Sequence, residues 1–350
     1  MKALYPLLVV LALALVAFLG AQVGALHLLF AVAIPYAAVV LFLGGFVYRV
    51  VKWAQVPVPF RITTTCGQQQ SLPWIKSNNL ESPHNTLGVI GRMAMEVLFF
   101  RSLFRNSTTE LRGNRLIYGE EKLLWLGGLV FHWSFLIIVL RHLRFFTQPV
   151  PFFVPVLQAV DGFLQVGTPA VYITGVTVMV GLAFLFARRV WMPQIRYISL
   201  PSDYFPLYLI FGIALTGVLM RYFFRVDVVA VKELALGLIS LRPVMTVPQG
   251  VSPLFFTHLF LVSSLLAYFP LSKLMHMGGI FLSPTRNLAN TNRARRHVNP
   301  WNYPVPVHTY AEWEEEFRDK LEMADIPLDH PHMVPSEPGK QPEILAQGGQ

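Results

Sequence analysis

Long apolar stretches without charged residues alternate with polar connections along most of the chain. A helix of about 20 apolar residues crosses the hydrocarbon core of a bilayer, which is roughly 30 Å thick. The stretches are uniformly apolar rather than alternating, so they predict membrane helices and not the strands of a barrel. Six spans are predicted, at 4–22, 27–48, Leu123–Leu140, Gly162–Ala187, Tyr204–Met220 and Pro243–Ser272.

The composition supports this interpretation. Of the 350 residues, 54% are hydrophobic and 13% are charged, and the mean hydropathy is +0.51. A soluble domain carries roughly 25% charged residues. We therefore expect an all-α integral membrane protein. Residues 1–22, with Lys2 before the apolar stretch and small residues at Gly20 and Ala21, loosely fit a cleaved signal peptide, but we favour an uncleaved first span.

Basic residues are distributed unevenly between the connections. With the amino terminus inside, the inner segments (Lys2, 49–122, 188–203 and the tail after 272) hold 22 of the 28 lysines and arginines. The outer connections hold the other six, which are Arg141, Arg144, Arg221, Arg225, Lys232 and Arg242. Since cytoplasmic loops carry the excess of Lys and Arg, we expect a multi-pass protein of the cytoplasmic membrane with both termini inside. The formal charge of +9 then needs no nucleic-acid partner.

The connections divide the chain into four parts. We expect two N-terminal transmembrane helices (1–48), a cytoplasmic loop (49–122), a four-helix core (123–275) and a cytoplasmic tail that binds a partner (276–350).

Two helices are predicted outside the membrane. Residues 89–106 place apolar side chains at helical spacing between charged ones, which favours an amphipathic helix on the inner membrane surface, against a partner or over the chain's own bundle. In the tail, Thr309 and Glu312 form a capping-box pattern that predicts a helix over roughly 310–324. A helix this short needs a surface to pack on, and we favour a protein partner over the chain's own loop.

Four of the ten histidines fall within or just beyond two predicted spans. His132 and His142 belong to the third span, and His258 and His276 to the sixth. Ionisable residues at membrane depth are costly and usually mark function. The other six lie in a turn, in loops or in the tail, where we expect ordinary roles: His27, His84, His297, His308, His330 and His332.

The spacing of the four histidines predicts two facing pairs. Eighteen residues make five helical turns, so His258 and His276 would share one face, while ten residues separate His132 and His142 by about 15 Å. The two spans are antiparallel, which pairs His142 with His258 at the outer level and His132 with His276 at the inner level. Opposed imidazoles at two depths suit two bis-histidine b haems in a four-helix-type core. Zinc would require four ligands at one point.

Other residues refine the candidate site. Arg141 and Arg144 bracket His142, where they could pair with haem propionates or extend to lipid headgroups. Cys66 is the single cysteine, so the chain holds no iron–sulfur cluster of its own, and electron transfer would require a redox partner.

The histidine pattern resembles the dihaem cytochrome b (gamma) subunit of respiratory nitrate reductase, over about residues 25–280. The first span is an addition to that family's five. The segments "CGQQQSLPWIKSNNLESPHNTLGVIGRMAMEVLFFRSLFRN" and "SPTRNLANTNRARRHVNPWNYPVPVHTYAEWEEEFRDK" look like the DsrM family, the membrane cytochrome b of the sulfite-reduction-associated DsrMKJOP complex. The related archaeal subunit is the Hdr-like menaquinol oxidoreductase cytochrome b.

The resemblance implies a subunit with two b haems that exchanges electrons between menaquinol and a cytoplasmic iron–sulfur subunit similar to heterodisulfide reductase (DsrK-like), in dissimilatory sulfur metabolism. Other membrane and outer-face redox subunits would complete the complex. Our own candidates for a quinone site beside the outer haem are Asp161, Gln165 and Arg141. The nitrate reductase family has a lysine near this haem, whereas residues 145–167 contain neither lysine nor arginine.

Other functions stay open at this point. A cytochrome b of a nitrate reductase, hydrogenase or formate dehydrogenase would carry the same haem pattern. A non-redox membrane anchor or a six-span transporter would carry no haem, and the sequence has no evident inverted repeat of the transporter kind.

Overall fold

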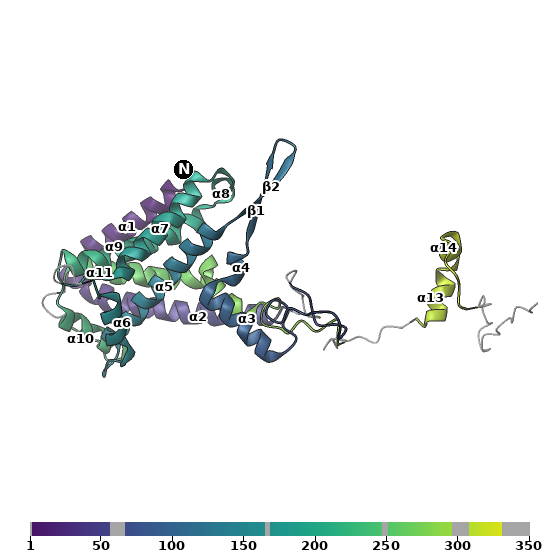
Figure 1. Ribbon diagram of the computed structural model, residues 1–350. Helices are drawn as coiled ribbons and strands as arrows, with labels where there is room; N and C mark the ends of the chain where they lie inside the picture. The colour runs from purple at the N-terminus through teal and green to yellow at the C-terminus, as the bar shows by residue number, and fades with distance from the viewer. Residues whose placement is uncertain (1, 57–66, 165–168, 247–250, 296–307, 331–350) are drawn as a thin grey trace, which may run out of the picture. The chain divides into compact units, whose positions relative to one another are not determined.

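The computed structural model describes residues 2–56, 67–164, 169–246, 251–295 and 308–330. The chain forms two compact units, Met1–His297 and Val298–Gln350, which are described separately. The first unit is a bundle of apolar helices, with a loop segment and a hairpin at one end (Figure 1).

Within the described residues, five helical segments are long and apolar enough to cross a membrane. They are Gly24–Ala54, which includes α2 (Ile34–Ala54), then α5 (Lys122–Phe146), α7 (Ile173–Trp191), α9 (Pro201–Tyr222) and Pro253–Leu271, which includes α11 (Pro253–Tyr268). The first predicted span is α1 (Leu4–Gly20), an apolar helix of 17 residues that is about 25 Å long. The architecture therefore agrees with an all-α membrane protein, and five of the six predicted spans have the length of a crossing.

Two predicted spans begin later than the apolar pattern suggested. The fourth helix starts at Ile173 rather than Gly162, because residues 162–164 and 169–172, which follow the separate helix α6 (Phe153–Asp161), are not helical. The sixth starts at Pro253 rather than Pro243. Proline at the first turn of a helix has its φ already fixed and loses no hydrogen bond there, so Pro253 marks a natural start.

The last span does not continue as one regular helix to His276. After α11 the chain makes two 3₁₀ turns, η3 (Phe269–Leu271) and η4 (Lys273–Met275), around the extended residue Ser272 (φ −115°, ψ 176°). The Ser272 hydroxyl accepts the Leu274 N–H at 3.2 Å and starts the second turn. Short helices follow at α12 (His276–Gly279) and η5 (Ile280–Leu282). The prediction that His258 and His276 lie five turns apart on one helix is therefore wrong.

The helices of the core pack in a row. Close contacts join α5 to α7, α7 to α9 and α9 to α11, while α1 and α2 pack against α11. A buried cluster of Phe131, Val178, Leu182 and Ile210 fastens α5, α7 and α9 together. Within the described residues, α5 and α11 are the first and last helices of this series, and they do not pack closely against each other.

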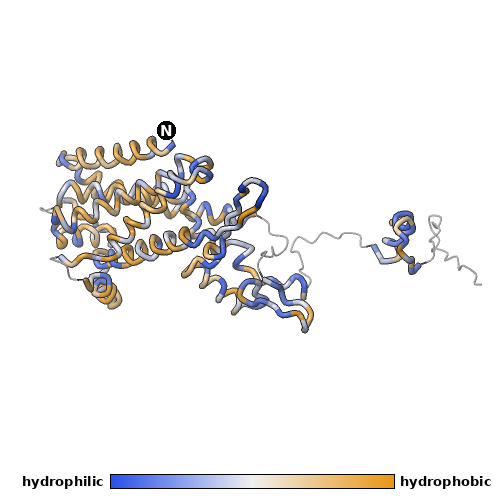
Figure 2. The backbone as a smooth tube through the Cα atoms, turned by 45° about the horizontal axis from the view of Figure 1, so that its top comes forward, coloured by the Kyte–Doolittle hydropathy of each residue, from blue (hydrophilic) through white to orange (hydrophobic). Residues whose placement is uncertain are grey.

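The ends of the bundle differ in the elements they carry. The N-terminus, α8 (Pro193–Ile198) and the hairpin lie at one end, here called the hairpin end (Figure 1). The other end carries α6 and α10 (Val228–Ile239), both packed against α5, and is called the α10 end. Hydrophobic residues follow the bundle helices and give way to hydrophilic ones at α8 and in the hairpin (Figure 2).

The hairpin was not expected from the sequence. Strands β1 (Ser107–Arg112) and β2 (Arg115–Glu120) pair in antiparallel register around a turn in which Gly113 takes a φ of 61°. Leu111 faces Leu116 across the strands, and both side chains are exposed. The hairpin thus projects an uncovered apolar pair beside the start of α5.

The predicted amphipathic helix forms as two helices, and charged side chains of the first are buried. α3 (Thr86–Phe99) ends where Phe100 takes a left-handed φ of 51°, and α4 (Arg101–Phe104) follows. Arg92 and Glu96 are buried, whereas Leu87 and Ile90 are 80% and 59% exposed. The apolar face of α3 therefore points away from this unit.

Glu81 organises the loop segment that supports α3 and α4. Its carboxylate pairs with Arg105 and, at 2.7 Å, with Arg101, while its carbonyl accepts from Arg92 at 2.7 Å. Burial raises the pKa of the Glu81 carboxyl, but the hydrogen bonds and charges of Arg101 and Arg105 outweigh it, so the pKa lies below its ordinary value of 4.5. The ionised carboxylate is the form that holds the two arginines.

The second unit contains the predicted tail helix as two pieces, α13 (Tyr310–Glu316) and α14 (Arg318–Met323), separated at Phe317. The Thr309–Glu312 capping box is confirmed, with each side chain bonded to the backbone N–H of the other residue. The buried Glu314 carboxylate accepts the backbone N–H groups of Asp329 and His330 and so folds the following chain back onto the helix.

Glu81→Gln should lower the free energy of unfolding of the loop segment by about 1–3 kcal/mol at neutral pH, because hydrogen bonds to a charged group are lost. The depressed folded-state pKa means that the wild-type advantage is complete above pH 4.5 and is lost as the pH falls through that folded pKa. Thermal unfolding in detergent, followed at several pH values, measures this. Glu110→Gln, which removes an exposed ion pair with Arg112, is the control. A Glu81→Gln effect that did not shrink in acid would contradict the assignment.

Candidate functional site

The structure brings the four membrane histidines together as two pairs. His142 of α5 faces His258 of α11, with ring centroids 6.5 Å apart and ring planes 12° from parallel. His132 of α5 faces His276, with centroids 6.0 Å apart and planes at 80°. The pairing is the one that the spacing predicted, although His276 reaches its place through the turns after α11 rather than on the helix itself.

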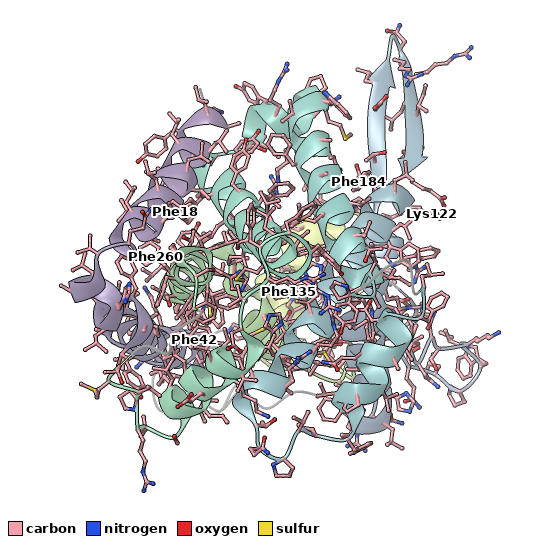
Figure 3. The ribbon with its side chains drawn as sticks, turned by 90° about the vertical axis from the view of Figure 1, so that its left-hand side faces the viewer. Phe18, Phe42, Lys122, Phe135, Phe184 and Phe260 are labelled. Atoms are coloured by element: carbon pink, nitrogen blue, oxygen red, sulfur yellow. The ribbon has the colours of Figure 1, made fainter. Side chains whose placement is uncertain are left out.

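Phe135 shows which way this face of α5 points. It lies three residues after His132 and seven before His142, so all three side chains fall on neighbouring positions of one helix face. Seen end-on, Phe135 lies near the centre of the bundle (Figure 3). It packs against the Phe131 and Leu182 cluster, so an apolar layer separates the two histidine levels.

Hydrogen bonds leave the same ring nitrogen available in three of the four histidines. Nδ1 of His132 lies 2.7 Å from the Gly128 carbonyl, and Nδ1 of His142 lies 2.7 Å from the Ile138 carbonyl. Nδ1 of His276 lies 2.8 Å from the Lys273 carbonyl. A carbonyl oxygen only accepts, so Nδ1 must carry the hydrogen in each ring, and a neutral ring then keeps its lone pair on Nε2.

His258 reaches the same state through a side chain. Its Nδ1 lies 2.9 Å from the hydroxyl oxygen of Thr216 on α9. That hydroxyl lies 2.9 Å from the Gly212 carbonyl and 3.0 Å from the Ile213 carbonyl, to which it donates. Its oxygen is left to accept the Nδ1–H of His258, and Nε2 is again the free nitrogen.

The pairs have the donor set and the separation of bis-imidazole iron sites. Two metal–nitrogen bonds of about 2 Å each, together with the radii of two imidazole rings, span about 6 Å between centroids. His142 and His276 are exposed, and His132 and His258 are partly exposed, so accessible space adjoins every ring. Since α5 and α11 do not pack closely, a flat macrocycle could fit between the paired imidazoles at each level. The four histidines could therefore hold two haem irons.

Arg141 points away from the histidines into a buried ion pair. Its Nε lies 3.1 Å from the Asp161 carboxylate, and both side chains are at most 10% exposed. Asp161 also accepts from the Thr174 backbone N–H at 2.8 Å and from the Thr174 hydroxyl at 2.6 Å. The sequence suggested Asp161 as a quinone-binding residue. In the structure its carboxylate instead links α5, α6 and the start of α7.

A tyrosine extends this cluster to α9. The guanidinium carbons of Arg141 and Arg221 each lie 3.8 Å from the centroid of the Tyr172 ring, a distance that two cations reach only from opposite faces. Arg221 also donates to the Ala170 carbonyl at 3.1 Å. The cluster closes the α10 end of the bundle around the His142 level.

The remaining predicted site residues are placed differently. Arg144 lies 5.0 Å over the ring of its neighbour Phe145, and it makes no ion pair within the described residues. Gln165 lies outside the described residues. Lys232 of α10 donates to Gln148 at 2.6 Å. A lysine from another helix therefore contacts the segment 145–167, which contains no lysine or arginine.

The other described histidines each contact a residue of this chain, as expected for structural roles. His27 bonds the Ala21 carbonyl at 2.7 Å and stacks on Phe256, and His330 bonds Glu314 at 2.6 Å. His308 lies 3.2 Å from Glu316, and His84 lies 3.4 Å from Asn85. His297 and His332 are outside the described residues.

Sequence reasoning missed Thr216, Gln148 and Lys232. The available signal for Thr216 was a hydroxyl within an apolar span, but serines and threonines are common in membrane helices and most bond their own backbone. Gln148 and Lys232 are 84 residues apart, and no pattern along the chain links them.

Comparisons with known proteins show the family to which the chain is similar. The family of nitrate reductase gamma subunits matches residues 93–294, which include all four paired histidines. An "Hdr-like menaquinol oxidoreductase cytochrome b-like subunit" of Archaeoglobus fulgidus is 45% identical over 288 residues, which cover 81% of this chain and 86% of the relative. A protein of the same description from Archaeoglobus profundus is 41% identical over 284 residues, covering 79% and 84%.

Asp161→Asn should lower the free energy of unfolding by about 3–5 kcal/mol, because it leaves the buried Arg141 guanidinium without a countercharge. The double variant Arg141→Met, Asp161→Leu removes both charges and should recover most of this loss. Thermal unfolding in detergent compares the two variants. A double variant no more stable than Asp161→Asn would show that Arg141 or Asp161 has another partner.

Proposed function

Because the chain belongs to the nitrate reductase gamma subunit family, we propose that it is the dihaem cytochrome b subunit of a membrane menaquinol oxidoreductase complex. The relatives named as Hdr-like menaquinol oxidoreductase subunits support the menaquinol assignment. The observation that carries the proposal is the arrangement of the four histidines. They form two facing pairs, and Nε2 is free in each ring.

His132 and His276 would hold one haem b, and His142 and His258 the other. A haem b bound at each level would supply a one-electron carrier. The chain's own residues orient the four rings, keep the space between α5 and α11 open and place an apolar layer containing Phe135 between the levels. Arg144 is the proposed partner for a propionate of the haem at His142, since its guanidinium has no acid partner among the described residues.

We place the hairpin end in the cytoplasm, in the cytoplasmic membrane. The basic residues of 49–122 and 188–203 support this orientation. The N-terminus, α8 and the hairpin all lie at that end, as an inner location of these segments requires (Figure 1). Menaquinol would then bind at the α10 end, near His142, and release its protons outward.

The quinol site itself is proposed at the surface between α5, α6 and α10. Arg141 and Asp161 would form its wall rather than bond the quinol, because they bond each other and Thr174. Gln148 and Lys232, joined at 2.6 Å, are polar groups at the same end that could bond a quinone oxygen. Gln165 stays a candidate from the sequence.

The electron partner is proposed to be a cytoplasmic iron–sulfur subunit similar to heterodisulfide reductase, as in DsrMKJOP-type complexes of dissimilatory sulfur metabolism. The single Cys66 leaves this chain without a cluster of its own. The tail unit is suited to such docking. Tyr310 and Trp313 stack at 5.7 Å and are 54% and 40% exposed. Around them, residues 308–330 hold eight acidic side chains against two basic ones (Glu312, Glu314, Glu315, Glu316, Asp319, Glu322, Asp325 and Asp329 against Arg318 and Lys320).

His142→Ala should reduce the haem content from about two to about one per chain, because the outer iron loses one of its two imidazole ligands. His258→Ala should give the same result, and His84→Ala, a loop variant, should leave the content unchanged. Haem extraction and reduced-minus-oxidised absorption of the purified chain provide the measurement. Retention of both haems in His142→Ala would refute the ligand assignment.

Trp313→Ala should weaken co-purification of the cytoplasmic subunit by at least about tenfold, since exposed aromatic side chains often dominate an interface. Met323→Ala, which removes a side chain that is 83% exposed in the same unit, is the matched control. Binding of the separated partner is measured at two salt concentrations, and the acidic surface predicts weaker binding at the higher one. Equal binding by both variants and wild type would assign the tail another role.

A further inference from the structure

We propose that Thr216 of α9 is the positioning residue for His258, fixing its ring plane and its proton at one haem level only. This inference rests on the proposed haem ligation and deepens it. It concerns a residue that holds a ligand and does not itself touch the iron.

The hydrogen-bond partners of the four histidines are not equivalent. His132, His142 and His276 each donate to a backbone carbonyl three or four residues earlier in their own segment. No side-chain substitution removes such an acceptor. His258 instead donates to a hydroxyl from a different helix, 42 residues away in the sequence. The orientation of this one ring therefore involves a replaceable side chain of another helix, next to the Ile213 carbonyl that the ring also bonds.

The direction of the hydrogen bonds makes Thr216 a defined acceptor. Its hydroxyl hydrogen is taken by the carbonyls of Gly212 and Ile213, at 2.9 and 3.0 Å, so the oxygen presents a lone pair to His258. α9 also approaches the ring closely at Gly217, where a Cβ would lie 3.6 Å from Cε1 of His258. The same helix thus sets both the tautomer and the position of the ring.

Two physical consequences follow for an iron bound there. Donation from Nδ1–H makes Nε2 a stronger electron donor, which favours the oxidised iron. The angle between the planes of the two imidazoles that would hold such an iron would govern the anisotropy of the electron paramagnetic resonance (EPR) signal of a low-spin ferric haem. The planes are 12° apart at the His142–His258 level and 80° apart at the His132–His276 level. The two levels should therefore give different signals, and a change in one can be measured separately.

Thr216→Val in the full chain tests the proposal, with potentiometric titration and EPR of the purified oxidised protein. We expect one of the two midpoint potentials to move upward and one of the two low-spin signals to change, while the other haem keeps its wild-type values. The affected haem should also dissociate in detergent at least about tenfold more readily, as for other losses of a partner bonded to a metal ligand. Thr216→Ser, which keeps the hydroxyl, should restore all three properties.

The matched control is Thr257→Val. Thr257 precedes His258 on α11, is buried, and donates to the Pro253 carbonyl of its own helix at 3.0 Å. Its loss should leave both potentials and both signals unchanged. If Thr216→Val does not assemble, Thr216→Ala takes its place in the same measurements.

The outcomes separate this inference from the function on which it rests. A wild-type chain without b haem contradicts the proposed function itself. Two haems in the wild type, with neither potential nor signal moved in the Thr216 variants, overturn the role of Thr216 alone. Equal shifts at both haems, or the same shift in Thr257→Val, would likewise overturn it, because they would reflect general packing.

Discussion

The hydrogen bond from each histidine Nδ1 determines what this bundle can bind. Inside a membrane an imidazole needs a partner for its N–H, and the partner decides which nitrogen remains free. In all four rings the partner holds Nδ1, so every Nε2 remains for another atom. The rest of the core maintains this arrangement. α7 and α9 connect α5 to α11 without bringing the two together, so facing imidazoles keep space between them.

Buried charge fastens secondary elements at both ends of the bundle. At the α10 end, Arg141, Asp161 and Thr174 tie α5, α6 and α7 together, with Tyr172 between two guanidinium groups. At the hairpin end, Glu81 gathers Arg101 and Arg105, and Glu96 accepts the backbone N–H of Ser102 at the start of α4. Such groups are costly to bury unless they are fully paired, so the ends of the bundle owe their shape to specific partners rather than to apolar packing.

The sequence was sufficient for features with a period or a fixed spacing. Uninterrupted apolar runs located five helices of crossing length, and the Thr309–Glu312 pattern located the tail helix. The histidine pairing followed from antiparallel direction and spacing. Features set by contacts between distant residues could not be read in this way. Apolar residues of α3 were expected to face a surface, but the inward turn of Arg92 and Glu96 depends on the loop beneath them. The start of α7 at Ile173 and the end of α11 at Tyr268 depend on local turns that hydropathy does not register.

The interruption at Pro270 and Ser272 separates the segment that carries His276 from the helix that carries His258. His258 is part of α11, so a small rotation or tilt of that helix would move its imidazole ring. His276 is set by the short turn that Ser272 begins, and by the packing of Pro270 against Gly45 of α2, where a Cβ would lie only 2.6 Å from the proline ring. Substitutions along α11 can therefore retune one level of the site while the other stays in place, which a single unbroken helix would not allow.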